Sequence, residues 1–195
     1  MKLQNYLPLL AATMLAAPAM AAPVFITTNA DLVASPFSFD VQGATFTLSG
    51  KNDFSAPLTV QTDADGEFSS FGGFLGIPVT PSSSFTNRGT VQYGPGVFGS
   101  YASFETPSSV NFSNGENFLG FRTLVGNDAY YGFVFTTNGM LNGYGYETSA
   151  NTTITATTTA PAVPEPATWA MMIGGFAFAG SVLRRRKSAA SVAYA

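Results

Sequence analysis

The sequence predicts an all-β fold, an antiparallel β-sandwich, and three observations support this. The 195 residues include 18 Phe and 8 Tyr but only 10 % charged residues, so apolar surface for a core is plentiful. The 20 Gly and 12 Pro, together with frequent Ser, Thr and Asn, are typical of many turns between short strands. One segment, residues 130–146, also has the pattern of a β-hairpin.

Short apolar segments bounded by Gly, Asn, Asp and Pro are the candidate strands. In the first, residues 37–48, Phe39 and Val41 alternate with polar residues, and Gly43 is the expected place for a bulge or bend. The spacing of the segments suits a sandwich. The other candidates are residues 58–61, 90–93, 100–104 and 117–124.

The clearest local prediction is the hairpin of residues 130–137 and 140–146. Its turn, Asn138-Gly139, favours the two-residue turn whose twist matches that of paired strands. We expect its aromatic side chains to fill the inner faces of the sandwich. The alternative is a platform on which sugar rings stack.

The N-terminal residues 1–21 have the order of a secretory signal peptide. Lys2 precedes an apolar run, and Ala19 and Ala21 are small residues that fit the narrow pocket of a signal peptidase. We expect a signal helix that is removed by cleavage after Ala21, with cleavage after Ala22 as the alternative. An N-terminal core helix is disfavoured because prolines interrupt the segment.

The C-terminal residues 164–187 begin with the triplet Pro164-Glu165-Pro166. Its prolines fix φ and disfavour helix in the residues that precede them, so we expect this segment to be extended. An extended peptide is accessible to a processing enzyme.

An uncharged apolar stretch, residues 167–183, follows the triplet. At ~1.5 Å rise per residue, it is at the short limit for a single transmembrane helix. Clustered cations hold its far end in the cytoplasm, which places the body outside and makes residues 188–195 a cytoplasmic tail. The expected membrane anchors are Trp169 at the outer interface and Arg184, Arg185, Arg186 and Lys187 at the inner one.

Together these residues, PEPATWAMMIGGFAFAGSVLRRR, resemble the PEP-CTERM sorting signal of Gram-negative bacteria. The resemblance implies that an exosortase-like membrane enzyme recognises Pro164, Glu165 and Pro166 and cleaves near them. It also implies delivery to the cell surface or to an exopolysaccharide matrix. Residues 188–195 depart from such signals, which usually end soon after the basic cluster. The alternative is a single-span anchor that is never cut.

The hairpin also resembles the last core strands of many PEP-CTERM proteins, whose bodies look like jelly-roll or concanavalin-like sandwiches. We therefore expect the sandwich body at residues 22–147 and a Thr- and Pro-rich stalk at residues 148–163. The Thr run of the stalk suggests glycosylation. It is too short for a regular ice-facing array.

Charge and composition exclude several function classes. Three cations and ten acidic residues lie in residues 22–163, a formal charge of −7, which disfavours nucleic acid as a partner. The chain has no Cys, so disulfides and thiolate metal sites are excluded. It has no His either, which removes the commonest general base and every Ser-His or Cys-His nucleophile.

One acidic cluster suggests a weak calcium site. Asp63, Asp65 and Glu67 alternate before and after a glycine, as in calcium-binding loops, but no Glu closes a twelve-residue loop. A solvated turn is the favoured interpretation, and no cofactor is expected.

A pair of carboxylates could in principle hydrolyse a glycosidic bond. The candidates Glu105, Glu116 and Glu147 lie on or beside expected strands, but the sequence places no two of them at the required ~5–10 Å. We therefore expect no enzyme activity.

These observations favour an exported cell-surface or exopolysaccharide-matrix protein with a structural or adhesive role. A carbohydrate-binding module is the alternative, and a glycan-active enzyme or an ice-binding protein is disfavoured. The expected partners are a signal peptidase, an exosortase-like enzyme, the membrane and an exopolysaccharide.

Overall fold

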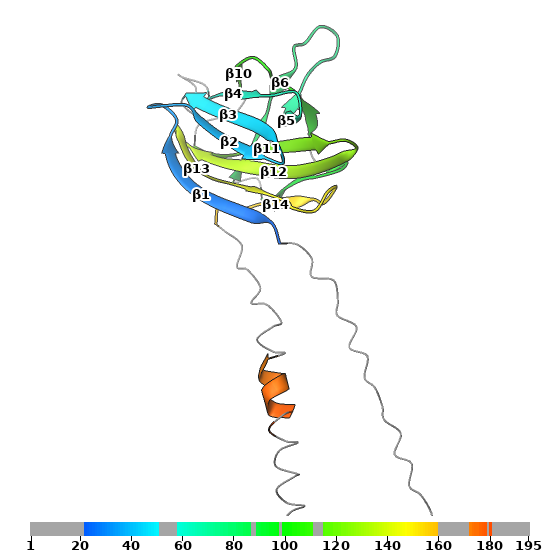
Figure 1. Cartoon of the computed structure of the whole chain (residues 1–195). Coiled ribbons are helices and arrows are strands. Elements are labelled where there is room, and N and C mark those ends of the chain that lie inside the picture. Colours follow the sequence, from blue (N-terminus) through cyan, green and yellow to red (C-terminus); the bar gives the residue numbers. More distant parts are fainter. Residues whose placement is uncertain are drawn as a thin grey trace, which may run out of the picture. The chain divides into compact units, whose positions relative to one another are not determined.

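The computed structural model describes residues 22–50, 58–86, 89–97, 99–110, 115–159, 172–178 and 180 (Figure 1). Its body is all-β and its paired strands run antiparallel, as the sequence predicts. Two apolar clusters separate the sheets into three layers: a four-stranded sheet, an eight-stranded sheet and a short strand pair. The eight-stranded sheet therefore lies in the middle and has both faces largely buried.

The large sheet has the order β1-β13-β12-β11-β5-β6, with β7 beside β11 and β9 beside β5. The four-stranded sheet has the order β10-β4-β3-β2, and β14 pairs with β8. The strands are β1 (Val24–Asp31), β2 (Phe37–Val41), β3 (Ala44–Gly50), β4 (Leu58–Thr62), β5 (Gly66–Phe71), β6 (Thr80–Pro81), β7 (Ser83–Phe85), β8 (Val91–Tyr93), β9 (Ser100–Ala102), β10 (Ser108–Ser109), β11 (Glu116–Val125), β12 (Asp128–Thr137), β13 (Met140–Tyr146) and β14 (Ile154–Ala156).

The main core lies between the four-stranded sheet and the large sheet. Phe46 of β3 is fully buried at its centre, and its ring centroid lies 4.6 Å from that of Phe121, 5.3 Å from that of Phe68 and 5.4 Å from that of Phe39. The hydroxyl of Thr123 in β11 donates to the carbonyl oxygen of Val41 across the two sheets. Aromatic packing and this buried hydrogen bond hold the two layers together.

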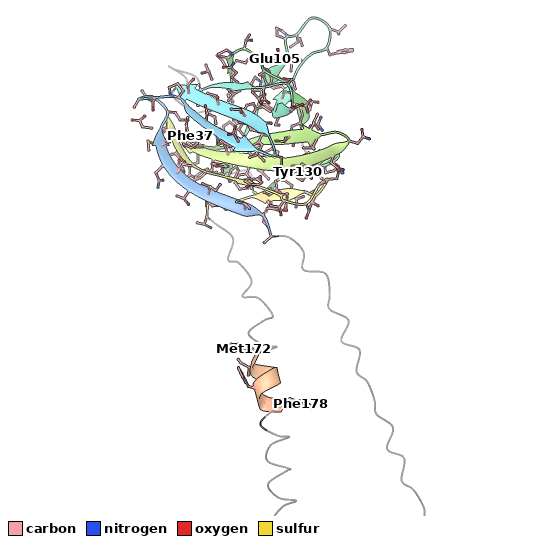
Figure 2. All side chains as sticks on the ribbon, in the orientation of Figure 1. Phe37, Glu105, Tyr130, Met172 and Phe178 are labelled. Carbon is pink, nitrogen blue, oxygen red and sulfur yellow. The ribbon has the colours of Figure 1, made fainter. Side chains whose placement is uncertain are left out.

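The second core lies on the opposite face of the large sheet, under β8 and β14. Alternate side chains of β12 are buried in this core. Figure 2 shows the side chains of the body on the ribbon. The expectation that the hairpin aromatics pack inside the fold is confirmed for three rings of β12, which are at most 5 % exposed, whereas Tyr130 and Tyr146 are only partly buried. The three rings are those of Tyr131, Phe133 and Phe135.

The predicted hairpin is confirmed as β12–β13. Thr137 pairs with Met140, so Asn138 and Gly139 form a two-residue turn, and their φ angles of 48° and 89° are both positive, as a type I′ turn requires. The prediction at Gly43 was wrong in detail. Val41 pairs with Ala44, so Gly43 belongs to the tight turn of a β2–β3 hairpin and residues 37–48 are not one bent strand.

The body extends beyond residue 147, where a stalk was expected to begin. Ile154 is 3 % exposed and β14 pairs with β8, and the compact unit ends at Ala156. Asn151 closes this segment onto β12, because its amide oxygen accepts from the N–H of Ala129 and its own N–H donates to the carbonyl oxygen of Ala129. These contacts are long-range, so composition alone did not reveal them.

An ion pair joins β5 to β11 on the large sheet. The Arg122 guanidinium donates to the Glu67 carboxylate, and it lies 4.7 Å from the centre of the Tyr101 ring. Burial alone would lower the pKa of Arg122, but Glu67 and Tyr131 outweigh it and raise that pKa. Burial raises the pKa of Tyr101, which stays neutral. The pair is 27 % and 17 % exposed at its two side chains, so water screens it only in part.

The C-terminal unit begins at Thr157 and is described at residues 157–159, 172–178 and 180, of which 172–178 and 180 are helical. Within the described residues, no helix has both the length and the apolar character needed to cross a membrane. The signal helix of residues 1–21 lies outside the described residues, as does most of the expected transmembrane stretch of residues 167–183.

Candidate functional site

The outer face of the four-stranded sheet is a regular polar surface of the described body. In strands β2, β3 and β4, polar residues toward solvent alternate with residues toward the core, which are apolar except for Thr62 and the strand-end Gly50. We call the outward set the polar face. Its members are Ser38, Asp40, Thr45, Thr47, Ser49, Thr59, Gln61 and Ser109, with Asp63 one residue past β4.

The strand register arranges the polar face in three rows across the sheet. One row is Ser38, Thr47 and Gln61; the next is Asp40, Thr45 and Asp63; the third is Ser49, Thr59 and Ser109. Neighbours along a row lie ~4.8 Å apart, and the same strand contributes again after ~6.7 Å. The result is a regular array of hydrogen-bonding groups.

Hydrogen bonds within each row hold the side chains in place. The hydroxyls of Ser38 and Thr47 lie 2.8 Å apart, and the Thr45 hydroxyl donates to the Asp40 carboxylate at 2.7 Å. In the third row, the hydroxyls of Ser49 and Thr59 lie 2.7 Å apart. Each of these oxygens keeps at least one further acceptor position for a ligand or water. The array is therefore pre-organised without being saturated.

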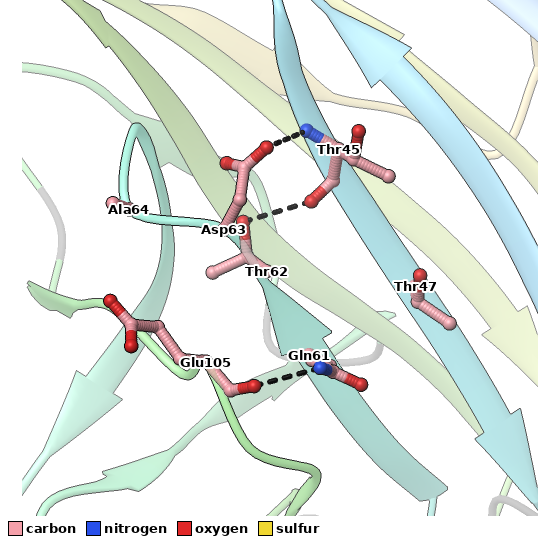
Figure 3. A pocket seen from close by; sticks show the side chains of 7 residues that line it. All are labelled: Thr45, Thr47, Gln61, Thr62, Asp63, Ala64 and Glu105. Carbon is pink, nitrogen blue, oxygen red and sulfur yellow. Dashed lines mark hydrogen bonds between the residues drawn. The ribbon is translucent and has the colours of Figure 1, made fainter.

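An open groove of about 420 Å³ lies at one end of the polar face (Figure 3). Its floor comes from β3 and β4, and the segment after β9 closes one side through Glu105. The side-chain amide of Gln61 donates to the backbone carbonyl of Glu105 at 2.7 Å, which fixes that side. The groove is lined by Thr45, Thr47, Gln61, Thr62, Asp63, Ala64 and Glu105, so its chemistry is that of hydroxyls, one amide and two carboxylates.

The turn suggested as a calcium site is built into the sheets by its own hydrogen bonds. The Asp63 carboxylate accepts from the N–H of Thr45, and the carbonyl oxygen of Asp65 accepts from the N–H of Leu124. Glu67 is paired with Arg122. In the described part of the chain, no group of three or more acidic residues is placed to hold a metal ion.

The three glutamates considered for catalysis occupy different places. Glu105 lines the groove, whereas Glu116 begins β11 and accepts from the Thr86 hydroxyl. Glu147 follows β13, donates its N–H to the carbonyl oxygen of Tyr131 and is 7 % exposed. Burial raises the pKa of Glu147. The structure therefore brings neither Glu116 nor Glu147 to the groove.

Sequence reasoning did not identify the polar face, although its signal is visible in the sequence. Polar residues recur at every second position within each of residues 37–41, 44–49 and 58–61, while the positions between them are apolar. What the sequence lacks is the register, which aligns the rows.

The family comparison concerns the other end of the chain. Residues 162–187 match the model of the PEP-CTERM protein-sorting motif. This chain carries a PEP-CTERM sorting signal. The motif implies an exported protein that an exosortase sorts, and it points to export through the membrane to the cell surface. Comparison with curated proteins and with solved structures gives no match.

The residues expected to be read during export lie outside the described residues. They are Ala19 and Ala21 at the signal-peptidase site, Pro164, Glu165 and Pro166 in the sorting triplet, and Trp169, Arg184, Arg185 and Arg186 at the membrane interfaces. Their roles stay predictions.

Proposed function

We propose that this PEP-CTERM chain is a structural or adhesive protein of the cell surface or exopolysaccharide matrix, and that its polar face contacts polysaccharide. The observation that carries the proposal is the array of three rows on the four-stranded sheet. Polysaccharides present hydroxyls at short repeats, and an array of hydroxyls, amide and carboxylates can bond to them as donor and acceptor.

We expect a single body to bind polysaccharide weakly and many bodies along one polymer to bind it strongly. A neutral hydrogen bond exchanged with water contributes only about 0.5–1.5 kcal/mol. The polar face presents no aromatic side chain among its members, so aromatic stacking adds little there. Repeated weak contacts along one polymer give avidity, which suits adhesion. In this proposal the body binds and does not catalyse, and the signal peptidase acts only during export.

The test is retardation of the purified body, residues 22–159, in native gels that contain the polysaccharide of the producing cell. We expect wild type to be retarded and Thr47→Val, which removes one hydroxyl at constant shape, to be retarded less. Thr27→Val, an exposed position on edge strand β1, is the matched control and should behave as wild type.

Two results would count against the proposal. One is equal retardation of wild type and Thr47→Val, which would move the contact away from the polar face. The other is a fall in polysaccharide chain length during incubation, which would indicate the carboxylate-dependent hydrolysis set aside above.

A further inference from the structure

The loop between β5 and β6, residues 72–79, carries the two most exposed large apolar side chains of the described body, Leu75 at 86 % and Phe74 at 73 %. Ile77 in the same loop is 58 % exposed. We call these three residues the apolar tip. The loop projects from the body in Figure 1, well away from the start of β1. The sequence contains no charged residue between Glu67 and Arg88, so the tip lies in a long uncharged segment.

The apolar tip is a built structure. The N–H of Gly73 donates to the carbonyl oxygen of Ile77, and the N–H of Ile77 donates to that of Phe74. A Cβ at Gly73 would lie 2.6 Å from Cγ2 of Val79, so this glycine permits the close approach. Leu75 has a φ of 50°, a left-handed conformation that costs about 1–2 kcal/mol in a residue other than glycine. The fold therefore holds a leucine in a strained conformation and in water.

The chemistry of the tip fits a hydrocarbon phase. Its turn satisfies part of its own backbone polar groups internally, as an apolar environment requires. A stable protein interface needs about 800 Å² from each partner with a polar rim; three side chains on a projecting turn provide neither. A polysaccharide offers no apolar phase to them.

The sorting signal implies that the chain passes through a membrane during export, so this body meets a lipid bilayer. The body is also acidic, so attraction to anionic lipids is not what would hold it.

We propose that the apolar tip inserts into the interfacial region of a lipid bilayer and gives the body a second membrane contact, separate from the sorting signal. Binding of this kind increases with the apolar area that is inserted. It is strongest on zwitterionic bilayers and is weakened by anionic lipid. This inference does not depend on polysaccharide binding.

The test uses residues 22–159, which contain every strand and both apolar clusters, with zwitterionic phosphatidylcholine vesicles in a flotation assay. Leu75→Asn removes the most exposed apolar side chain, and Asn accepts a positive φ, so the variant should fold as stably as wild type. We expect it to bind vesicles at least about tenfold more weakly. Val33→Asn, at an apolar position 61 % exposed in another turn, is the matched control and should bind as wild type.

A fluorescent reporter locates the contact. The only tryptophan of the chain is Trp169, outside this fragment, so Phe74→Trp introduces a single indole. Its emission should shift to shorter wavelength when vesicles are added. Three results would overturn the proposal: equal binding by wild type and Leu75→Asn, no emission shift, or self-association through the tip without vesicle binding.

Discussion

Replacing Gly132 with Ala tests the close packing of β12 against the core. Gly132 pairs with Phe121 of β11, whose fully buried ring lies over it. A Cβ at position 132 would lie 2.5 Å from Cε2 of Phe121 and 2.7 Å from the carbonyl oxygen of Gly145, and closer still to Cζ of Phe121. The Gly145 oxygen belongs to β13, the partner strand of β12, so relief requires movement of the sheet backbone.

Overpacking of this kind costs about 1–3 kcal/mol, and we take the upper half of that range because a backbone atom is involved. The unfolded chain has less backbone entropy with Ala than with Gly at this position, which offsets roughly 0.5 kcal/mol of that cost. A net loss of about 2 kcal/mol corresponds to a fall in Tm of about 6–10 °C for a domain of this size. Thermal unfolding of residues 22–159, followed by far-UV circular dichroism, measures it.

The same substitution in a Phe121→Leu variant separates a steric conflict with the ring from a general effect of Ala in a strand. Phe121→Leu removes the ring edge that faces position 132, so Gly132→Ala should cost less in that background than in wild type. Equal costs in both backgrounds, or a Tm within about 1 °C of wild type for Gly132→Ala alone, would refute the reasoning.

Three further predictions concern the same body. Because burial raises the pKa of Glu147, its charged form destabilises the fold as pH rises, so Glu147→Gln should raise Tm at pH 7 and lose that advantage below about pH 4. A pH series of melting curves checks the sign, and a stabilisation that persists at low pH would contradict it. Arg122→Met should lower the free energy of unfolding by about 1–3 kcal/mol, because it leaves Glu67 unpaired in a half-buried site. Urea unfolding measures this loss, and adding Glu67→Gln should recover part of it. No recovery would show that the broken ion pair is not the cause. Asn138→Ala should lower the free energy of unfolding by about 1 kcal/mol, because Ala is disfavoured at the positive φ of this turn. Asn138→Gly should lower it less, since Gly accepts a positive φ, and urea unfolding measures both variants.

The parts of the fold that follow from local chemistry were predictable. The turn at Asn138-Gly139 requires two positive φ angles that these residues accept, and this alone positioned the hairpin. Strand β1, in contrast, was not predicted. It follows the predicted signal peptide directly and is defined by its pairing with β13, far away in the sequence.

The third layer was predicted only in part, because residues 90–93 were a candidate strand but their long-range pairing was not visible. Strand β14 has only three residues in a Thr- and Ala-rich stretch, and it becomes a strand because β8 and the aromatic face of β12 cover it. The polar face was predictable only in part. Its alternation is local and visible, but the rows depend on the register of three strands.

Intact-mass measurement of the protein recovered from cells and from culture medium tests whether the chain is exported and sorted through its two ends. We expect a mature species that begins at Ala22 and ends near Pro164-Glu165-Pro166, without Arg184 and the residues that follow it. The mass of the complete 195-residue chain, recovered from the cytosol, would contradict this expectation.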